Sequence, residues 1–206
     1  MKFLNLPESC PFKRVDRLPE VRHPRYVPPL EDFLKVLQAA EGQDRIMLLA
    51  YFYTAARRSE LLRLKWEDVD FEAGTVGLWT KKRQRGNWEY DKVPMAQDLA
   101  LELKKHKLAQ GGGEFVFTRK SGKRFTKRNH LMAWLCRLAG VKPFGFHGIR
   151  HLAPSVAIDN AAVSLFDVQH LLRHASAMTT QRYLHKLRKN NRAVDALEGA
   201  LKRQIG

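Results

Sequence analysis

Cysteine and long apolar runs are scarce in this sequence, and each shortage excludes a class of protein. Cys10 and Cys136 are the two cysteines, too few for a disulfide framework and without metal-ligand spacing, which indicates a reducing, cytoplasmic setting. The most apolar stretch, residues 46–56, is far shorter than a membrane span, and the N-terminus lacks the apolar core of a signal peptide. We therefore expect a soluble protein that is neither exported nor held in a membrane.

Acidic residues are outnumbered by basic ones, which narrows the choice of partner. The 206-residue chain holds 37 Lys and Arg against 21 Asp and Glu, a formal net charge of +16 at pH 7. Such an excess is typical of a protein that binds a polyanion, and nucleic acid is the leading candidate. The alternative is a basic protein whose charge only keeps it dispersed in solution.

The first 28 residues differ from the rest of the chain. Six of the nine prolines fall within residues 1–29, where no helical or alternating pattern persists, so residues 1–28 are predicted to be a linker. Residues 29–206 are expected to form a compact domain with a core of its own. A helix is predicted near its end, over residues 191–204.

Within this domain, helical patterns surround a short region of strands. Apolar residues at positions 30, 33, 34 and 37 predict an amphipathic helix, and residues 44–56 predict a buried one. Ser59 can cap a third, short helix through Trp66. Residues 69–71, 75–80 and 90–93 predict strands joined by turns at 73–74 and 86–87.

Later segments add more helix, so the fold class is predicted to be α+β, mostly helical with a small antiparallel β-sheet. Residues 97–106 and 127–139 predict helices, and residues 115–117 predict a short strand between them. The remainder from His147 is expected to form three or four helices. Pro154 predicts a kink or a late helix start in the first of these.

Four segments combine basic, histidine and tyrosine side chains in a recognisable order. They are TAARRSEL (54–61), TKKR (80–83), HGIRH (147–151), and LLRH (171–174) followed by TTQRYLH (179–185). Together they resemble the tyrosine recombinase (phage integrase) family, from about residue 27 to residue 192. That family places an Arg after a T-G-x motif, a Lys in a β-hairpin, an H-x-x-R pair, a His in an L-L-G-H motif and a Tyr shortly after it. Each piece alone is weak, but their order and spacing together are specific.

The resemblance implies a DNA breaking and rejoining catalytic domain and assigns its residues. The implied catalytic residues are the phosphate-clamping Arg57 and Arg150, the hairpin Lys82, the phosphate-contacting His147 and His174, and the nucleophile Tyr183. Glu60 falls where many family members carry an acidic residue that supports the site. Lys81 stays a candidate beside Lys82 because the register of the hairpin is open.

The assignment is also reasonable on chemical grounds alone. A tyrosine oxygen can conserve the broken phosphodiester as a phosphotyrosyl ester, so no metal or nucleotide cofactor is required. Because a phenol has a pKa of about 10, a base or a positive field must help to remove the proton of Tyr183, and His147 with the arginines can supply both. Guanidinium groups suit the charge that grows on the phosphate oxygens. Lys82 can protonate the departing 5′ oxygen.

The other basic residues and histidines have less specific interpretations. His151 is expected to bury its ring beneath the site as a supporting residue, and His170 and His185 are interpreted as structural or surface residues. Contacts to flanking DNA phosphates, with solvated positions as the alternative, are predicted for Arg58, Arg119, Lys120, Lys123, Arg124, Lys127, Arg128, Arg173 and Arg182.

A metal site is the chemical alternative, because two pairs of histidines lie one helical turn apart. These pairs are His147 with His151 and His170 with His174. The glutamate of a zinc-protease H-E-x-x-H motif is replaced by Gly148, and nearby arginines would add positive charge beside a cation. We therefore predict no metal site.

The sequence departs from the family wording at three places. Ala55 stands for the usual Gly before the first Arg, Gly148-Ile149 for the usual Asp-Leu, and Arg173 for the Gly before the second His. Arg173 either adds a phosphate contact or alters its loop. The family also carries an N-terminal domain that closes around DNA, which nothing before Pro29 can form, so we expect the chain to be a fragment holding the catalytic half.

These observations predict a site-specific recombinase or integrase that acts on double-stranded DNA as a homo-multimer, in the cytoplasm and associated with the nucleoid of a prokaryotic host. The alternatives are a type IB topoisomerase or a resolvase, which would use the same residues, and a non-catalytic DNA-binding module of the same fold. Retention of all six implied catalytic side chains favours catalysis over the last of these.

Overall fold

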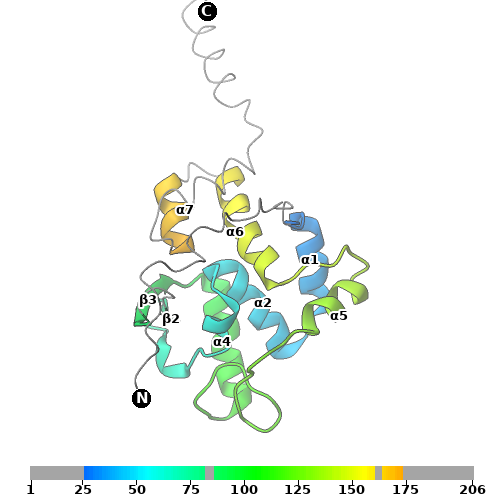
Figure 1. The fold of residues 1–206 in the computed structure, drawn as a ribbon. Helices are drawn as coiled ribbons and strands as arrows, with labels where there is room; N and C mark the ends of the chain where they lie inside the picture. Colours follow the sequence, from blue (N-terminus) through cyan, green and yellow to red (C-terminus); the bar gives the residue numbers. More distant parts are fainter. Residues whose placement is uncertain (1–25, 82–85, 161–163, 174–206) are drawn as a thin grey trace, which may run out of the picture.

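The computed structural model describes residues 26–81, 86–160 and 164–173. Helices precede and follow a small sheet, which confirms the predicted α+β architecture (Figure 1). The helices are α1 (Leu30–Ala39), α2 (Gly42–Thr54), α3 (Arg58–Leu61), α4 (Gln97–Gln110), α5 (Leu131–Leu138), α6 (Phe146–Asn160) and α7 (Leu165–Leu172). The short 3₁₀-helix η2 (Trp66–Asp68) leads into strands β1 (Val69–Asp70), β2 (Thr75–Lys81) and β3 (Trp88–Pro94). None of the helices in these ranges combines the length and apolar character that crossing a bilayer requires.

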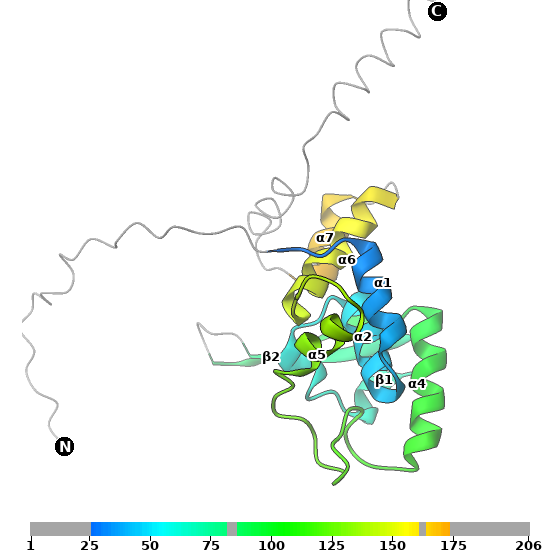
Figure 2. The same cartoon turned by 90° about the vertical axis from the view of Figure 1, so that its right-hand side faces the viewer.

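Helix α2 lies at the centre of the fold. It packs against α1, α3, α4 and α6, and most of its apolar side chains are buried, as the nearly continuous apolar pattern predicted. The Tyr51 ring stacks on Phe146 of α6 with 4.5 Å between ring centroids. In Figures 1 and 2, α6 and α7 form one end of the molecule, beyond α2. The central helix therefore links the N-terminal segments to the HGIRH segment of α6.

Helix α1 covers α2 through an amphipathic face. Phe33, Val36 and Leu37 are buried, whereas Leu34 is 45% exposed although the periodicity had placed it on the apolar face. Val36 is buried instead. With 3.6 residues per turn, Val36 lies on the same side of the helix as Phe33 and Leu37. The buried face of α1 is thus centred on Phe33, Val36 and Leu37, and Leu34 lies beside it.

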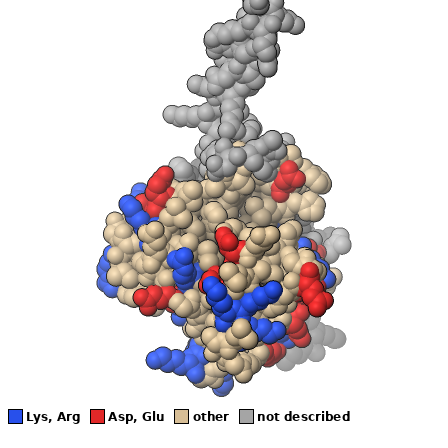
Figure 3. Space-filling model, turned by 180° about the vertical axis from the view of Figure 1, so that it is seen from behind, with Lys and Arg blue, Asp and Glu red and all other residues tan. Residues whose placement is uncertain are grey.

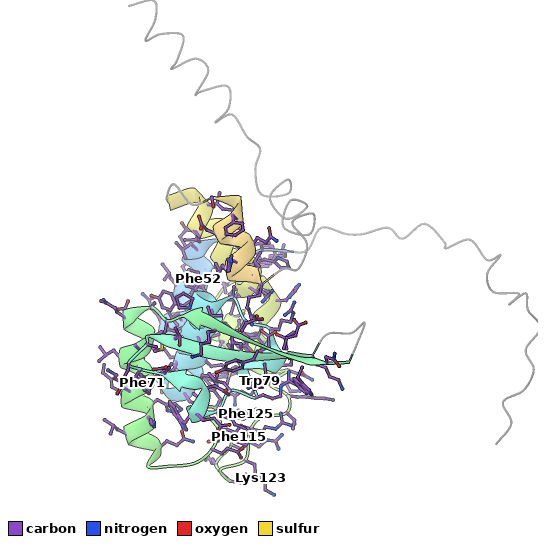
Figure 4. All side chains as sticks on the ribbon, turned by 90° about the vertical axis from the view of Figure 1, so that its left-hand side faces the viewer. Phe52, Phe71, Trp79, Phe115, Lys123 and Phe125 are labelled. Carbon is purple, nitrogen blue, oxygen red and sulfur yellow. The ribbon has the colours of Figure 1, made fainter. Side chains whose placement is uncertain are left out.

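The three strands form an antiparallel sheet in the order β1-β2-β3. Lys81 pairs with Trp88, and Trp79 pairs with Tyr90, so these four side chains share one face of the hairpin. A side chain at Gly77 would overlap the Tyr90 phenol, which explains the glycine in the middle of β2. Figure 4 shows the hairpin projecting beyond the helical body.

Several elements differ from the predictions, and contacts between distant segments explain the boundaries of α3 and α5. Helix α3 ends at Leu61 instead of Trp66, because the Leu64 carbonyl accepts the Val116 N–H at 2.9 Å and draws the chain out of the helix. The segment 115–117 is not a strand but makes a single bridge, between Lys65 and Phe115.

Two further differences lie in α5 and α6. Helix α5 begins at Leu131, not at Lys127, because the Arg128 side chain is bound to Asp44 outside the helix. Helix α6 runs through Pro154 from Phe146, so a late helix start is wrong.

Candidate active site

The turn after α2 presents the first of the predicted arginines. Ala55 is buried and adopts the left-handed conformation with φ 45°. The Thr54 hydroxyl donates to the Ala50 carbonyl at 2.5 Å and accepts the Ala56 N–H at 3.3 Å, which fixes the turn. Arg57 then stands at the N-cap of α3. Because glycine enters the left-handed region without the penalty of about 1–2 kcal/mol that other residues meet, the family glycine at this position has a backbone cause.

Glu60 is the buried carboxylate on which α3, β2 and α7 converge. Its Oε1 accepts Arg57 Nη1 at 2.8 Å and the Thr80 hydroxyl at 2.6 Å. Its Oε2 accepts the Arg57 backbone N–H at 2.7 Å and Arg173 Nη2 at 2.6 Å. Four hydrogen bonds fill the accepting capacity of the carboxylate. Glu60, not Ser59, therefore caps α3, and it ties Arg57 down at both backbone and side chain.

The ionisation of Glu60 is governed by two opposing causes. Burial raises the pKa of Glu60, but the positive charge of Arg173 and the hydrogen bonds that the carboxylate accepts outweigh burial and lower the pKa to about 2. Glu60 is thus a fixed anion at neutral pH, and it orients Arg57 by charge as well as by hydrogen bonding.

Arg150 lies beneath the same region in α6 and is 5% exposed. Its Nη1 donates to the Ala55 carbonyl, and its Nη2 donates to the Leu172 carbonyl at 2.6 Å. These carbonyls lie at the ends of α2 and α7, where helical partners run out. Arg150 therefore fixes both helix ends while its own guanidinium is held in one orientation.

Arg173 is buried, so the solvated position that the sequence left as an alternative is wrong. It adopts the left-handed conformation with φ 52° at the C-cap of α7, and its side chain is 8% exposed against 1% for Glu60. Its predicted contact with DNA phosphates stays a prediction. The family glycine before the second histidine again coincides with a left-handed backbone.

The arginines open onto a hollow of about 600 Å³. Arg57 and His147 lie on it as exposed side chains, and Arg150 lies at its floor. The His147 ring packs edge-on against His151, with centroids 4.3 Å apart. His151 is half-buried, in keeping with the supporting position expected of it. The structure thus brings together three of the implied catalytic residues from α3 and α6.

Two further basic residues line the hollow and are held by polar partners. Arg58 donates to the Asn129 side chain at 3.1 Å. Arg128 is paired with Asp44 and lies 4.3 Å from the centre of the Phe125 ring. Both are positioned to meet an anion that enters the hollow.

The remaining predicted DNA contacts lie on the loop before α5. Arg119, Lys120, Lys123, Arg124 and Lys127 are exposed. Figure 4 places Lys123 at the outer end of this loop. On the face in Figure 3, basic side chains lie among acidic ones, so the charge is not one uninterrupted surface.

Lys81 is exposed, and its Nζ lies 6.0 Å from the centre of the Trp88 ring. Its neighbour Thr80 faces Glu60 from the opposite side of β2. Lys81 therefore points away from the carboxylate that orients Arg57.

Several predicted residues lie outside the described residues: Lys82, His174, Arg182, Tyr183 and His185, the linker over residues 1–25 and the helix over residues 191–204.

Sequence reasoning missed three residues that position the site. Thr80 binds Glu60, Asn129 binds Arg58, and Asp44 binds Arg128. Strand alternation from the hairpin lysines could have singled out Thr80, because Thr80 and Lys81 must face opposite sides. No local sequence pattern predicts the contacts of Asn129 or Asp44.

Known proteins share both the sequence pattern and this fold. The model of the phage integrase family matches residues 27–190. The tyrosine recombinase XerC of Roseiflexus castenholzii is 32% identical over 186 residues, covering 86% of this chain and 59% of the relative. The chain therefore spans about three fifths of the length of that relative.

Solved structures agree in fold. The crystal structure of the XerA recombinase is matched with a TM-score of 0.67 at 22% identity, over 87% of this chain and 65% of that one. A XerH site-specific recombinase, solved in a post-cleavage complex with its palindromic difH substrate, is matched with a TM-score of 0.63 at 21% identity, over 82% of this chain and 52% of that one. Because the family model matches most of this chain, the chain belongs to the phage integrase family.

Proposed function

We propose that this chain is the catalytic part of a site-specific DNA recombinase, which cleaves and rejoins duplex DNA through a covalent 3′-phosphotyrosyl intermediate at Tyr183. The observation that carries the proposal is the hollow shared by Arg57, His147 and Arg150. Both arginines are fixed from behind, one by a carboxylate and one by carbonyls. Preorganised guanidinium groups stabilise the charge that develops on phosphate oxygens. Membership of the phage integrase family supports the same activity.

The reaction exchanges one phosphoester for another. The Tyr183 oxygen attacks phosphorus and loses its proton, with His147 and the positive field of the arginines assisting. The bond to the 5′ oxygen breaks, and that oxygen takes a proton from Lys82. A 5′-hydroxyl from a second strand then attacks the phosphotyrosyl ester and releases Tyr183. Because the number of phosphoester bonds is unchanged, no nucleotide hydrolysis is needed to drive the reaction, and in this scheme Arg57 and Arg150 stabilise the phosphate charge.

We assign the general acid to Lys82 rather than Lys81. Lys81 lies over Trp88, on the side of β2 opposite the Thr80 contact to Glu60. Replacing each lysine with alanine separates them: Lys82→Ala is expected to slow cleavage and Lys81→Ala is not. A 5′-bridging sulfur in the scissile link, which leaves without protonation, should restore cleavage by the impaired variant only.

Double-stranded DNA is the proposed partner, and strand exchange requires several copies of the chain on paired sites. Residues 1–28 are proposed as a linker and residues 29–206 as the catalytic domain, acting in the cytoplasm on nucleoid DNA. The XerH recombinase bound to its palindromic difH substrate and the Tn1549 transposon integrase in complex with transposon right end DNA support DNA as the substrate.

The decisive experiment is incubation of the chain with a nicked suicide DNA substrate, from which the cleaved end diffuses away and traps the covalent complex. The wild type is expected to yield an adduct that survives denaturation and chelators, and Tyr183→Phe none. Tyr26→Phe is the matched control, because its hydroxyl contacts only the nearby Asp32 among the described residues. An adduct that persists in Tyr183→Phe would contradict the nucleophile assignment, and no adduct from the wild type would contradict the proposed function.

A further inference from the structure

Position 173 combines two features that oppose each other. Its backbone is left-handed, with φ 52°, a conformation that disfavours an arginine by about 1–2 kcal/mol relative to glycine. Its long cationic side chain is nevertheless buried, 8% exposed, where an unpaired charge is strongly unfavourable. Two penalties at one residue call for a compensating contact.

That contact is the carboxylate of Glu60, 113 residues away in the sequence. The Nη2–Oε2 distance is 2.6 Å, and the Glu60 side chain is 1% exposed. A charge-assisted hydrogen bond in such surroundings is among the stronger polar contacts in proteins. The pair therefore joins the end of α7 to the start of α3.

Glu60 also binds Arg57 and so connects it to Arg173. The carboxylate binds Arg57 at the guanidinium and at the backbone N–H, at 2.8 and 2.7 Å. Arg173 thus lies one carboxylate away from an arginine of the hollow. Two guanidinium groups on one carboxylate leave a net positive charge, which suits a phosphate.

We propose that Arg173 is a positioning residue for strand cleavage: it holds Glu60 in place and ionised, and Glu60 in turn orients Arg57. This inference rests on the proposed function, because it concerns the same phosphate site. Arg173 Nε and Nη1 meet no acceptor among the described residues, although both are buried. Among the described residues, Glu60 is thus shared by two guanidinium groups, which leaves an excess of positive charge beside Arg57.

Removal of Arg173 should change how cleavage depends on pH. The charged and titratable groups that face Glu60 are Arg57, Arg63, Arg173 and the phenol of Tyr51. Without Arg173, burial pushes the pKa of Glu60 upward with less opposition. Protonated Glu60 then binds Arg57 less firmly, and cleavage falls on the acid side of neutrality.

The test measures single-turnover cleavage of the suicide substrate at saturating protein, from about pH 5 to about pH 9, together with DNA affinity. Arg173→Met is expected to cleave about 10- to 100-fold more slowly at neutral pH, with a new acid limb and unchanged affinity. Arg173→Lys should restore most of the rate. Arg137→Met, an exposed arginine of α5, is the matched control.

Two further variants make the outcome decisive. Arg173→Gly relaxes the left-handed backbone, so it is expected to fold more readily than Arg173→Met, and it should show the same slow cleavage. In a Glu60→Gln background, Arg173→Met should have little additional effect.

Wild-type rates and pH profiles in both Arg173→Met and Arg173→Gly would overturn the proposal, as would a loss of affinity with an unchanged rate. These outcomes differ from failure of the proposed function, in which the wild type itself forms no Tyr183-dependent adduct.

Discussion

The buried charged cluster of Glu60, Arg150 and Arg173, called the floor below, and the exposed basic loop before α5, called the rim, carry the same kind of charge in opposite surroundings. In the floor, Glu60, Arg150 and Arg173 are almost fully buried, and their contacts join α2, α3, α6, β2 and α7. In the rim, the basic side chains of the loop before α5 stand in solvent. Identical guanidinium groups are therefore parts of the fold at one level and solvated charges at the other.

The difference teaches where each effect of a substitution should appear. A buried, hydrogen-bonded charge cannot be removed without leaving its partners unsatisfied, so floor variants should alter stability and rate together. An exposed charge contributes mainly a salt-dependent attraction for a polyanion. Each prediction below either breaks or sharpens this contrast.

The largest effect is expected for Arg150→Met. The change leaves the Ala55 and Leu172 carbonyls without their buried donor and should destabilise the fold by about 2–4 kcal/mol. Cleavage should fall by at least about 100-fold. Urea unfolding and single-turnover cleavage measure the two losses. Arg150→Lys is the comparison, because it keeps the charge but not the two-pronged geometry.

If Arg150→Met were as stable as the wild type, the contacts of Arg150 with the two carbonyls would not contribute to the stability of the fold. The contrast between floor and rim would then hold for rate only.

Glu60→Gln is expected to remove a pH-dependent part of the stability. The folded-state pKa of Glu60 is lowered from 4.5 to about 2, so its contribution is complete above the unfolded value and is lost as pH falls from there through the folded value. Up to about 3 kcal/mol is involved. Urea midpoints for the wild type and the variant should converge below that window, and midpoints that stay equally far apart at all pH values would contradict it.

The rim variant Lys120→Gln with Lys123→Gln should leave stability and saturated cleavage rate unchanged. DNA affinity should fall, and the slope of log affinity against log salt should decrease by about one for each lost phosphate contact. Binding titrations over a range of salt concentrations test this. A changed saturated rate would show that the rim reaches into the catalytic step.

The smallest effect is expected for Ala55→Gly. Relief of the left-handed backbone offsets the loss of a buried methyl group and the greater freedom of the unfolded glycine, so stability should change by less than about 1 kcal/mol. Ala56→Gly is the matched control, because Ala56 is equally buried without a positive φ. Ala56→Gly should destabilise by more, as measured by urea unfolding.

The sequence alone predicted the parts that local patterns determine. The apolar run of α2, the alternating strands of the hairpin and the glycine turn at Gly74 follow from side-chain periodicity and backbone preference. The motif spacing led to Arg57, His147 and Arg150, which the fold brings to one hollow. Their catalytic roles stay predictions.

The sequence did not reveal what contacts between distant segments determine. The inward turn of Arg173 depends on Glu60, and the pairing of Arg128 depends on Asp44, 84 residues away. The early end of α3 depends on Val116 in the same way. From the sequence, Arg173 could either add a phosphate contact or alter its loop, and no local pattern indicated the buried pairing with Glu60.

Arg150 contacts the final carbonyl of α7. Phosphate binding at Arg150 and the ordering of α7 are therefore linked equilibria. Any state that frees the Leu172 carbonyl also releases one anchor of the guanidinium. A phosphate that favours the anchored orientation must, by reciprocity, favour an ordered α7. Amide hydrogens of α7 should consequently exchange more slowly once DNA is bound. The order of the helix that precedes His174 and Tyr183 in the sequence would then depend on phosphate binding, through the side chain of Arg150.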